Sequence, residues 1–385
     1  NTAVIGKGIH AESIYNDLAY LMPEVLGKSI PEELQRLGMF SLDGDFAYRT
    51  TSLQTNVWLK TNDGEAHIDG SLDDLTHTDK TAFKGTLTTN QFHLGKILDD
   101  PNIGAISTDM LVRGEGLDFA TMKLYANGTI HSVGYNGYNY QRIAINGEFR
   151  NQVFSGKIDT RDPNLMMSFN GLADLSGRNN KFDFQADIAL ADLHALRFME
   201  KDSISQFCGK VVIDISGNQL DDIVGKISFK NTNYINSAGD FTFKDFEVVS
   251  TLNNGIKEIT INSPDIVSGN VKGKFKLTEI KKVLQNAVGS IYTQYNPYKI
   301  EKNQYVDFHF NIYNKIVEVF VPKVKIGSNT FVNGNIDADK GSFKFQMKSP
   351  SINAYNNQID SLSLEIDNKN PLYNTYFEVK KADFG

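Results

Sequence analysis

The chain has 385 residues, of which 40% are hydrophobic and 22% are charged, and its formal net charge is −7. This composition predicts a folded protein rather than a disordered one. The acidic balance argues against nucleic-acid binding, which would require a basic patch. No apolar run in the sequence approaches the roughly 18 residues that a membrane-spanning helix needs.

The N-terminal part of the sequence divides into two predicted segments. Residues 1–10 are expected to form a strand or the end of a linker. Residues 11–38 predict an amphipathic helical insertion, because apolar residues such as Ile14 and Leu18 follow the spacing of one helix face, and Pro23 should kink it. The insertion could cover the end of a sheet, close a groove as a plug or lid, or lie on a membrane surface. Its acidic residues argue against an anionic membrane surface.

The sequence from residue 39 onward alternates apolar and polar residues in short runs separated by Asn, Asp, Gly and Ser. This pattern predicts an antiparallel meander. We expect β-groove repeats over residues 39–290 and a continuing repeat over 291–385, with helical interruptions at 92–98, 192–199 and 278–288. The predicted strands are 40–49, 52–60, 65–72, 81–89, 105–113, 122–132, 140–150, 152–159, 164–175, 180–190, 209–216, 222–230, 240–252, 256–262, 265–277, 304–313, 316–326, 329–338, 341–348, 361–367 and 374–380.

Glycine recurs on the apolar phase of these predicted strands. Examples are Ile68-Gly70-Leu72 and Phe83-Gly85-Leu87. A glycine inside a strand usually marks a bend, a bulge or a close approach of another backbone. The pattern is therefore typical either of a concave apolar surface with space along it, or of a sheet that coils tightly over a packed core.

The two faces of the predicted strands differ in polarity, which limits the possible folds. A sheet with one apolar face needs something to cover that face, and a flat sheet of about twenty strands would curl or split. A sandwich, a barrel and a long sheet folded lengthwise into a trough all satisfy these conditions. We predict the all-β class and, within it, a long bent antiparallel sheet with an open groove, a few short helices and the N-terminal insertion.

Candidate catalytic and metal-binding residues are sparse. The seven histidines lack the close spacing of a zinc site, and the single Cys208 permits no intrachain disulfide. The two Asp-x-Asp pairs, Asp43/Asp45 and Asp337/Asp339, do not continue into a calcium-binding loop. We therefore predict a protein that is not an enzyme and that has no cofactor and no metal site. Tyr135, with Tyr138 and the nearby Tyr140, suits either packing at a turn or stacking against a sugar.

Several segments resemble the AsmA-like family, in particular its TamB branch (translocation and assembly module proteins) as found in the Bacteroidota. The resemblance extends over most of the chain and is carried by a repeated style of sequence. The segments that carry it are Phe92-His93-Leu94-Gly95-Lys96-Ile97-Leu98, Val112-Arg113-Gly114-Glu115-Gly116-Leu117, Asp162-Pro163-Asn164-Leu165 and Phe169-Asn170-Gly171-Leu172-Ala173-Asp174-Leu175-Ser176-Gly177.

The resemblance implies a β-taco, which is an open groove built of AsmA-like repeats. It also implies a periplasmic location, a tether to the inner membrane outside this chain, and contact with an outer-membrane barrel protein of the TamA/BamA type through regions outside this chain. The chain lacks a starting methionine and a visible signal peptide, so we expect an internal fragment of a longer protein.

The leading functional prediction is a lipid conduit that carries phospholipid acyl chains between the inner and outer membranes in outer-membrane biogenesis. The alternative is a chaperone or scaffold that offers strand edges to barrel proteins during assembly. The predicted groove-lining residues share the apolar phase of the strands. They are Leu42, Phe46, Ile68, Leu72, Phe83, Leu87, Met110, Val112, Leu124, Ile130, Ile145, Phe149, Phe154, Ile158, Leu165, Met167, Phe169, Phe182, Phe184, Ile188, Ile213, Ile227, Val271, Phe275, Phe308, Phe310 and Ile336.

Overall fold

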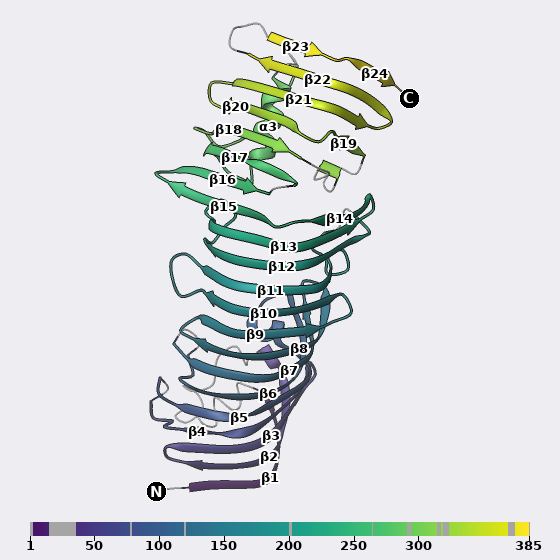
Figure 1. Ribbon diagram of the computed structural model, residues 1–385. Coiled ribbons are helices and arrows are strands. Elements are labelled where there is room, and N and C mark those ends of the chain that lie inside the picture. Colours follow the sequence, from purple (N-terminus) through teal and green to yellow (C-terminus); the bar gives the residue numbers. More distant parts are fainter. Residues whose placement is uncertain are drawn as a thin grey trace. The chain divides into compact units, whose positions relative to one another are not determined.

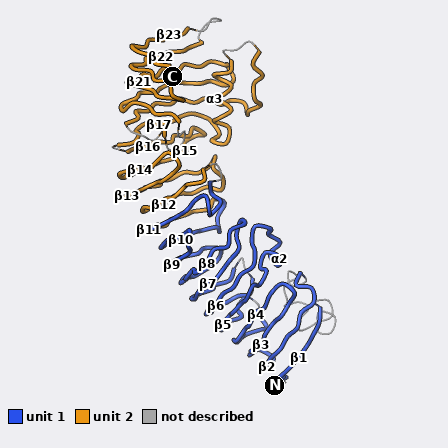
Figure 2. The backbone as a smooth tube through the Cα atoms, turned by 90° about the vertical axis from the view of Figure 1, so that its right-hand side faces the viewer, with its two compact units in different colours: residues 1–178, 186–200 blue, residues 179–185, 201–385 orange. Residues whose placement is uncertain are grey.

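The computed structural model describes residues 3–14, 36–77, 79–118, 121–199, 202–263, 265–290, 294–313, 317–318, 323–368 and 374–384. Within these ranges, 24 strands belong to one open antiparallel sheet, and two helices accompany it. The chain separates into two compact units, residues 1–178 with 186–200 and residues 179–185 with 201–385 (Figure 2). The predicted all-β class and the long open antiparallel sheet are therefore confirmed.

The elements of the first unit are one short helix and ten strands, followed by a strand that crosses the boundary between the units. They are β1 (Ala3–Ile14), β2 (Met39–Arg49), β3 (Ser52–Thr61), β4 (Gly64–Asp73), β5 (Ala82–His93), α2 (Leu94–Leu98), β6 (Ile103–Glu115), β7 (Lys123–Tyr135), β8 (Tyr138–Arg150), β9 (Val153–Arg161), β10 (Leu165–Asp174) and the crossing strand β11 (Lys181–Asp192).

The second unit contains the remaining strands and the second helix. They are β12 (Ser205–Ser216), β13 (Val224–Asn236), β14 (Gly239–Phe243), β15 (Phe246–Asn253), β16 (Ile256–Asn262), β17 (Val267–Lys274), α3 (Ile280–Gly289), β18 (Tyr305–Ile312), β19 (Val324–Ile326), β20 (Thr330–Asp337), β21 (Ser342–Ala354), β22 (Asn357–Asp367), β23 (Asn374–Glu378) and β24 (Lys381–Phe384).

Each unit is a meander in which neighbours in sequence are mostly neighbours in the sheet (Figure 1). From β1 to β10 every strand pairs antiparallel with the next one. The turn between β7 and β8 is a two-residue Asn136-Gly137 hairpin with φ of 49° and 76°, which is the conformation that this dipeptide favours. In the second unit β13 pairs with both β14 and β15, and β18 pairs with β20. The register of the β7–β8 pair is therefore fixed by a short turn.

Most predicted strands agree with the structure within a few residues. The predicted strand at 316–326 lies partly outside the described residues, and only its end is strand, as β19. The predicted strand at 240–252 is interrupted at residues 244–245, because β13 pairs with β14 at one end and with β15 at the other. The predicted helix at 92–98 is only α2, since Phe92 still belongs to β5, and the one at 192–199 is a series of turns.

The predicted segment boundaries also differ from the observed ones. β1 extends to Ile14 because it pairs with β2 over its whole length, so residues 11–14 of the predicted insertion are strand. Residues 15–35 of that insertion lie outside the described residues. The boundary between the two compact units falls within β11.

One line of directly opposed residues crosses the ten strands of the first unit and consists mainly of glycine. We call it the glycine row. Going from β1 to β10 it contains Gly6, Phe46, Thr55, Gly70, Gly85, Val112, Ala126, Gly147, Gly156 and Gly171. A Cβ atom added at Gly70 would lie 2.6 Å from the backbone oxygen of Lys84, and one at Gly156 would lie 2.5 Å from that of Asn146. At these two glycines the neighbouring backbone therefore approaches so closely that a side chain would not fit without a shift.

Two lines of apolar residues flank the glycine row on the same face of the sheet. We call them the first and second apolar rows. The first runs Val57, Ile68, Leu87, Met110, Gly128, Ile145, Ile158 and Phe169, and the second runs Leu53, Leu72, Phe83, Gly114, Leu124, Phe149, Phe154 and Ala173. Because side chains two residues apart share a face, the sequence alternation places all three rows on one face of the sheet.

In the second unit, α3 covers part of the apolar face. Val283 of α3, which is 1% exposed, packs with Phe275, Val306, Ile336 and Phe343 in a buried cluster. The side chain of Asp221 accepts hydrogen bonds from the backbone amide (3.2 Å) and the hydroxyl (2.7 Å) of Thr278, just before the helix. The helix is thus anchored at its start and seals the sheet beneath it with a conventional hydrophobic core.

Candidate functional site

A cavity of about 430 Å³ opens on the apolar face of the first unit, over β2 to β6. Three of the predicted lining residues, Leu42, Ile68 and Leu87, belong to its wall. The remaining lining residues are Leu37, Phe40, Leu59, Ala66, Thr89, Phe92, Leu94, Ile97, Ile106 and Thr108. Eleven of these thirteen residues are apolar, so the cavity is suited to a hydrocarbon guest.

The two threonines in this wall direct their hydroxyl groups into the sheet. The hydroxyl of Thr89 donates to the carbonyl of Ile106 at 3.1 Å, and that of Thr108 donates to the carbonyl of Thr129 at 2.9 Å. Each hydroxyl is thereby satisfied by the backbone. A water molecule needs two to four polar partners to be held in a cavity. These side chains therefore do not make the cavity attractive to ordered water.

One margin of the cavity is formed by Leu37 and α2, which are tied together by Arg36. The guanidinium of Arg36 donates to the carbonyl of Ile97 at 2.6 Å and lies 3.4 Å from the carboxylate of Asp99. Leu37 is 7% exposed and packs in a buried cluster with Ala66 and Phe92. The end of the predicted insertion therefore contributes directly to the cavity wall.

A bulge in β5 brings Phe92 into the same wall. The register between β5 and β6 shifts between Thr89 and Phe92, and Gln91 adopts a φ of 49°. The backbone amide of Gln91 donates a hydrogen bond to the hydroxyl oxygen of Ser107 at 2.9 Å. A bulge inserts one extra residue and re-aims the side chains that follow it. The sequence pattern assigns Phe92 to a helical interruption at 92–98, and alternation from Leu87 would place it on the polar face, so Phe92 is absent from the predicted lining residues.

The structure brings most of the other predicted lining residues of the first unit onto the same apolar face, outside the cavity. Ile145, Ile158, Phe169 and Met110 extend the first apolar row, and the second row contains Leu72, Phe83, Leu124, Phe149 and Phe154. Phe46 and Val112 lie on the glycine row, and Ile130 and Met167 lie beyond the first apolar row. All these residues are half-buried, as are Leu165, Phe182, Phe184 and Ile188.

The predicted lining residues of the second unit fall into two groups. Ile213, Ile227, Val271, Phe308 and Phe310 are half-buried. Phe275 and Ile336 are each 7% exposed, because they pack beneath α3 in the cluster around Val283. The expected uncovered apolar surface is therefore interrupted here, and these two residues are covered by the protein itself.

Aromatic side chains occupy space above several glycines of the apolar face. A Cβ atom at Gly147 would lie 2.6 Å from the ring of Phe154, and one at Gly334 would lie 2.7 Å from the ring of Phe308. Tight coiling and free space thus occur in the same sheet. The glycine row is where the strands of the sheet approach closely. The cavity lies beside this row, over the first apolar row near Ile68 and Leu87.

Tyr138, from the tyrosine cluster noted in the sequence, is hydrogen-bonded to a buried carboxylate of the protein. The carboxylate of Asp162, which is 1% exposed, accepts hydrogen bonds from the Tyr138 hydroxyl at 2.6 Å and from the amides of Gln141 and Asn164 at 2.8 Å each. Burial and this carboxylate raise the pKa of Tyr138 to about 12. The hydroxyl of Tyr138 is thus engaged within the protein and favours the packing role over sugar stacking.

The described residues contain no group of three or more His, Cys, Asp or Glu side chains placed to hold a metal ion. Cys208 is half-buried within β12, where it pairs with Asn233 of β13. Within the part of the chain that the structure describes, neither α2 nor α3 combines the length and the apolar composition of a membrane-crossing helix.

Comparison with known proteins returns no match to a protein-family model, to a curated protein sequence or to a solved structure.

Proposed function

We propose that this chain binds the acyl chains of lipids along the apolar face of its first unit, with the cavity over β2 to β6 as the principal site. The observation that carries this proposal is a cavity wall of eleven apolar residues and two threonines whose hydroxyl groups are bound to the backbone. Apolar cavities of this kind remain dry and accept apolar guests.

The size of the cavity suits one hydrocarbon chain. A methylene group is similar in size to a water molecule, which occupies about 30 Å³ in the liquid. The cavity of about 430 Å³ therefore has space for on the order of fourteen methylene groups. Each methylene removed from water contributes roughly 0.8 kcal/mol before the cost of immobilising the chain is subtracted.

The wider role that we propose is a segment of a lipid conduit of the TamB type. The first apolar row continues from Ile68 and Leu87 across the sheet to Phe169. Such a row gives an acyl chain successive apolar contacts while its headgroup stays in water. In this proposal the protein works in the periplasm, is tethered to the inner membrane and meets an outer-membrane barrel protein of the TamA/BamA type through regions outside this chain.

A second candidate function is favoured by the edge of the first unit. Among the described residues β1 pairs with β2 alone, and its Val4 and Ile5 side chains are 50% and 66% exposed. An exposed apolar edge strand can accept a further strand from a partner. A scaffold for unfolded barrel proteins is therefore the alternative. A bulge between Gly6 and Ile9 disturbs the pairing edge, so we place this function second.

The proposed function is tested by mass spectrometry of the lipids that co-purify with the protein and by displacement of a fluorescent fatty-acid analogue. We expect bound phospholipid, and we expect the variant Leu87→Asn to lose most of the fluorescent signal. The matched control is Thr86→Asn, which introduces the same residue at the adjacent, exposed position on the opposite face. Equal binding by both variants, or a purified protein free of lipid that does not take up the analogue, would refute the proposal.

A further inference from the structure

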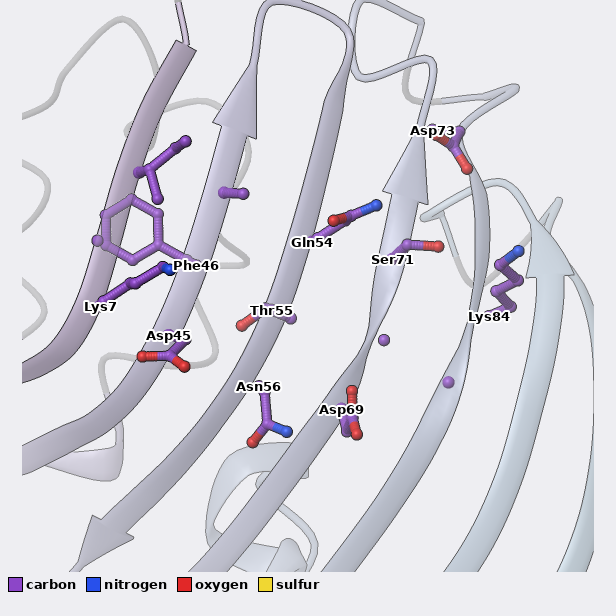
Figure 3. A pocket seen from close by; sticks show the side chains of 15 residues that line it. Lys7, Asp45, Phe46, Gln54, Thr55, Asn56, Asp69, Ser71, Asp73 and Lys84 are labelled. Carbon is purple, nitrogen blue, oxygen red and sulfur yellow. The ribbon is translucent and has the colours of Figure 1, made fainter.

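The polar face of the first unit carries a second hollow, of about 580 Å³, over β1 to β5. Its side chains come from two polar rows on either side of the glycine row. Asp45, Asn56 and Asp69 are directly opposed in one row, and Gln54, Ser71 and Lys84 are opposed in the next. Figure 3 shows these six side chains in two lines across the strands.

Planar polar groups predominate in this hollow. Asn56 and Gln54 supply amides, and Asp45, Asp69 and Asp73 supply carboxylates, while Lys7 and Lys84 supply ammonium groups. These groups donate and accept hydrogen bonds side by side. Three carboxylates against two ammonium groups leave the hollow nearly neutral. The lining therefore matches a ligand that is rich in hydroxyl groups better than it matches an ion.

An aromatic platform adjoins this hollow on the same face. Trp58, the only tryptophan of the chain, is 42% exposed and lies two residues along β3 from Asn56, a distance of about 7 Å. Its indole stacks on the imidazole of His67, with the ring centres 4.3 Å apart and the planes 14° from parallel. An exposed tryptophan on an otherwise polar sheet face is unusual, since this side chain is highly buried on average.

The platform and the hollow are held together by hydrogen bonds. The imidazole Nε2 of His67 lies 2.9 Å from the side-chain oxygen of Asn56. The carboxylate of Asp45, directly opposite Asn56, accepts a hydrogen bond from the backbone amide of Gly8 at 2.7 Å. Side chains fixed in this way lose little conformational freedom when a ligand binds.

We propose that this face is a carbohydrate-binding site. A pyranose ring packs its C–H face on the indole of Trp58, and the neighbouring sugar of the same chain places its hydroxyl groups over Asn56 and Asp69. Aromatic stacking combined with adjacent planar polar groups is what a polyhydroxylated ring requires, because the ring has an apolar face and a polar rim. This site lies on the face opposite the acyl-chain cavity and does not rest on the proposed lipid function.

The single tryptophan makes the test direct. The purified protein is titrated with chitohexaose, cellohexaose and maltohexaose, and tryptophan emission is followed together with calorimetric heat. We expect a saturable change in emission with at least one of these sugars and a Kd of about 1 mM or tighter. We expect Trp58→Ala to weaken binding roughly tenfold by calorimetry, Trp58→Phe to retain most of it, and Lys60→Ala to match the parent protein.

A second substitution separates ligand contact from folding. Asp69→Asn should keep the far-UV circular dichroism spectrum of the parent and bind more weakly, because the carboxylate is exposed and faces the hollow. Leu87→Asn, which tests the acyl-chain cavity, should leave sugar binding unchanged. The proposal is overturned if none of the three sugars gives a saturable signal up to about 10 mM, or if Trp58→Ala binds as tightly as the parent.

Discussion

The same substitution at two isoleucines of the apolar face should have opposite consequences for folding. Ile68 lines the cavity of the first unit and is 41% exposed, whereas Ile336 is 7% exposed and packs beneath α3. We consider Ile68→Asp and Ile336→Asp. At Ile68 the new carboxylate can reach water, while at Ile336 it would lie among Phe275, Val283 and Phe343.

The expected magnitudes follow from burial. Removing the Ile336 side chain from its cluster costs about 2–5 kcal/mol, and leaving an unpaired carboxylate there adds several more. The total is comparable to the roughly 5–15 kcal/mol that stabilises an ordinary domain. Ile68→Asp should cost about 1 kcal/mol or less, because the side chain is already partly in water. It nevertheless places a charge on the wall of a cavity that is otherwise apolar.

Thermal unfolding followed by circular dichroism and displacement of a fluorescent fatty-acid analogue distinguish these effects. We expect Ile336→Asp to lose its cooperative transition, and Ile68→Asp to melt close to the parent while binding the analogue at least tenfold more weakly. If Ile68→Asp unfolds as Ile336→Asp does, the face near Ile68 is a packed core. If it folds and binds the analogue like the parent, the cavity is not the acyl-chain site.

Three further predictions concern stability and are checked by urea unfolding. Gly85→Ala should lower the free energy of unfolding by about 1–3 kcal/mol, because its Cβ would lie 2.7 Å from the Cα of Gly70. Thr86→Ala should change the free energy of unfolding little. Equal stabilities of the two variants would refute the close approach at Gly85. Val283→Ala should lower the free energy of unfolding by about 2 kcal/mol, because Val283 is buried. Leu284→Ala should lower it clearly less, because Leu284 of the same helix is 42% exposed. The reverse order would contradict the packing of α3 on the sheet. Burial raises the pKa of Tyr138 from 10.0 to about 12. The contribution of the protonated Tyr138 hydroxyl group to folding stability is therefore complete below pH 10 and is lost as the pH rises towards 12. Tyr138→Phe should lack this component of the pH dependence, and an unchanged pH profile would contradict it.

Strand positions could be predicted from the sequence because they depend on local alternation and turn chemistry. Asn136-Gly137 illustrates this, since the dipeptide fixes both the turn and the pairing of Tyr135 with Tyr138. The apolar phase can be followed for the same reason, and Ile68 and Leu87 are directly opposed on one face. Their presence in the wall of one cavity follows from long-range pairing.

The parts of the site that could not be predicted depend on contacts that break the alternation. Phe92 enters the cavity only because of the bulge at Gln91, and Leu37 only because Arg36 binds the end of α2. Ile336 has the same sequence pattern as Ile68, but a helix covers it. Sequence alternation reports which face a side chain occupies and does not report what covers that face. The platform of Trp58 was missed for a related reason, because its partner His67 lies on another strand.

The contrast between the two units supports the acyl-chain proposal through a physical requirement. An apolar sheet face in water must be covered by the protein, by a partner or by a guest. In the second unit α3 covers part of the face. Beneath it, the side chains of Phe275, Val306, Ile336 and Phe343 are at most 7% exposed. In the described part of the first unit, α2 is five residues long and forms one margin of the cavity, and Ile68 is 41% exposed there. Extending α2 by two turns of apolar helix should therefore fill the cavity, raise the melting temperature and abolish binding of a fatty-acid analogue together. A longer helix that stabilised the protein and left binding intact would show that the guest, if any, is held elsewhere.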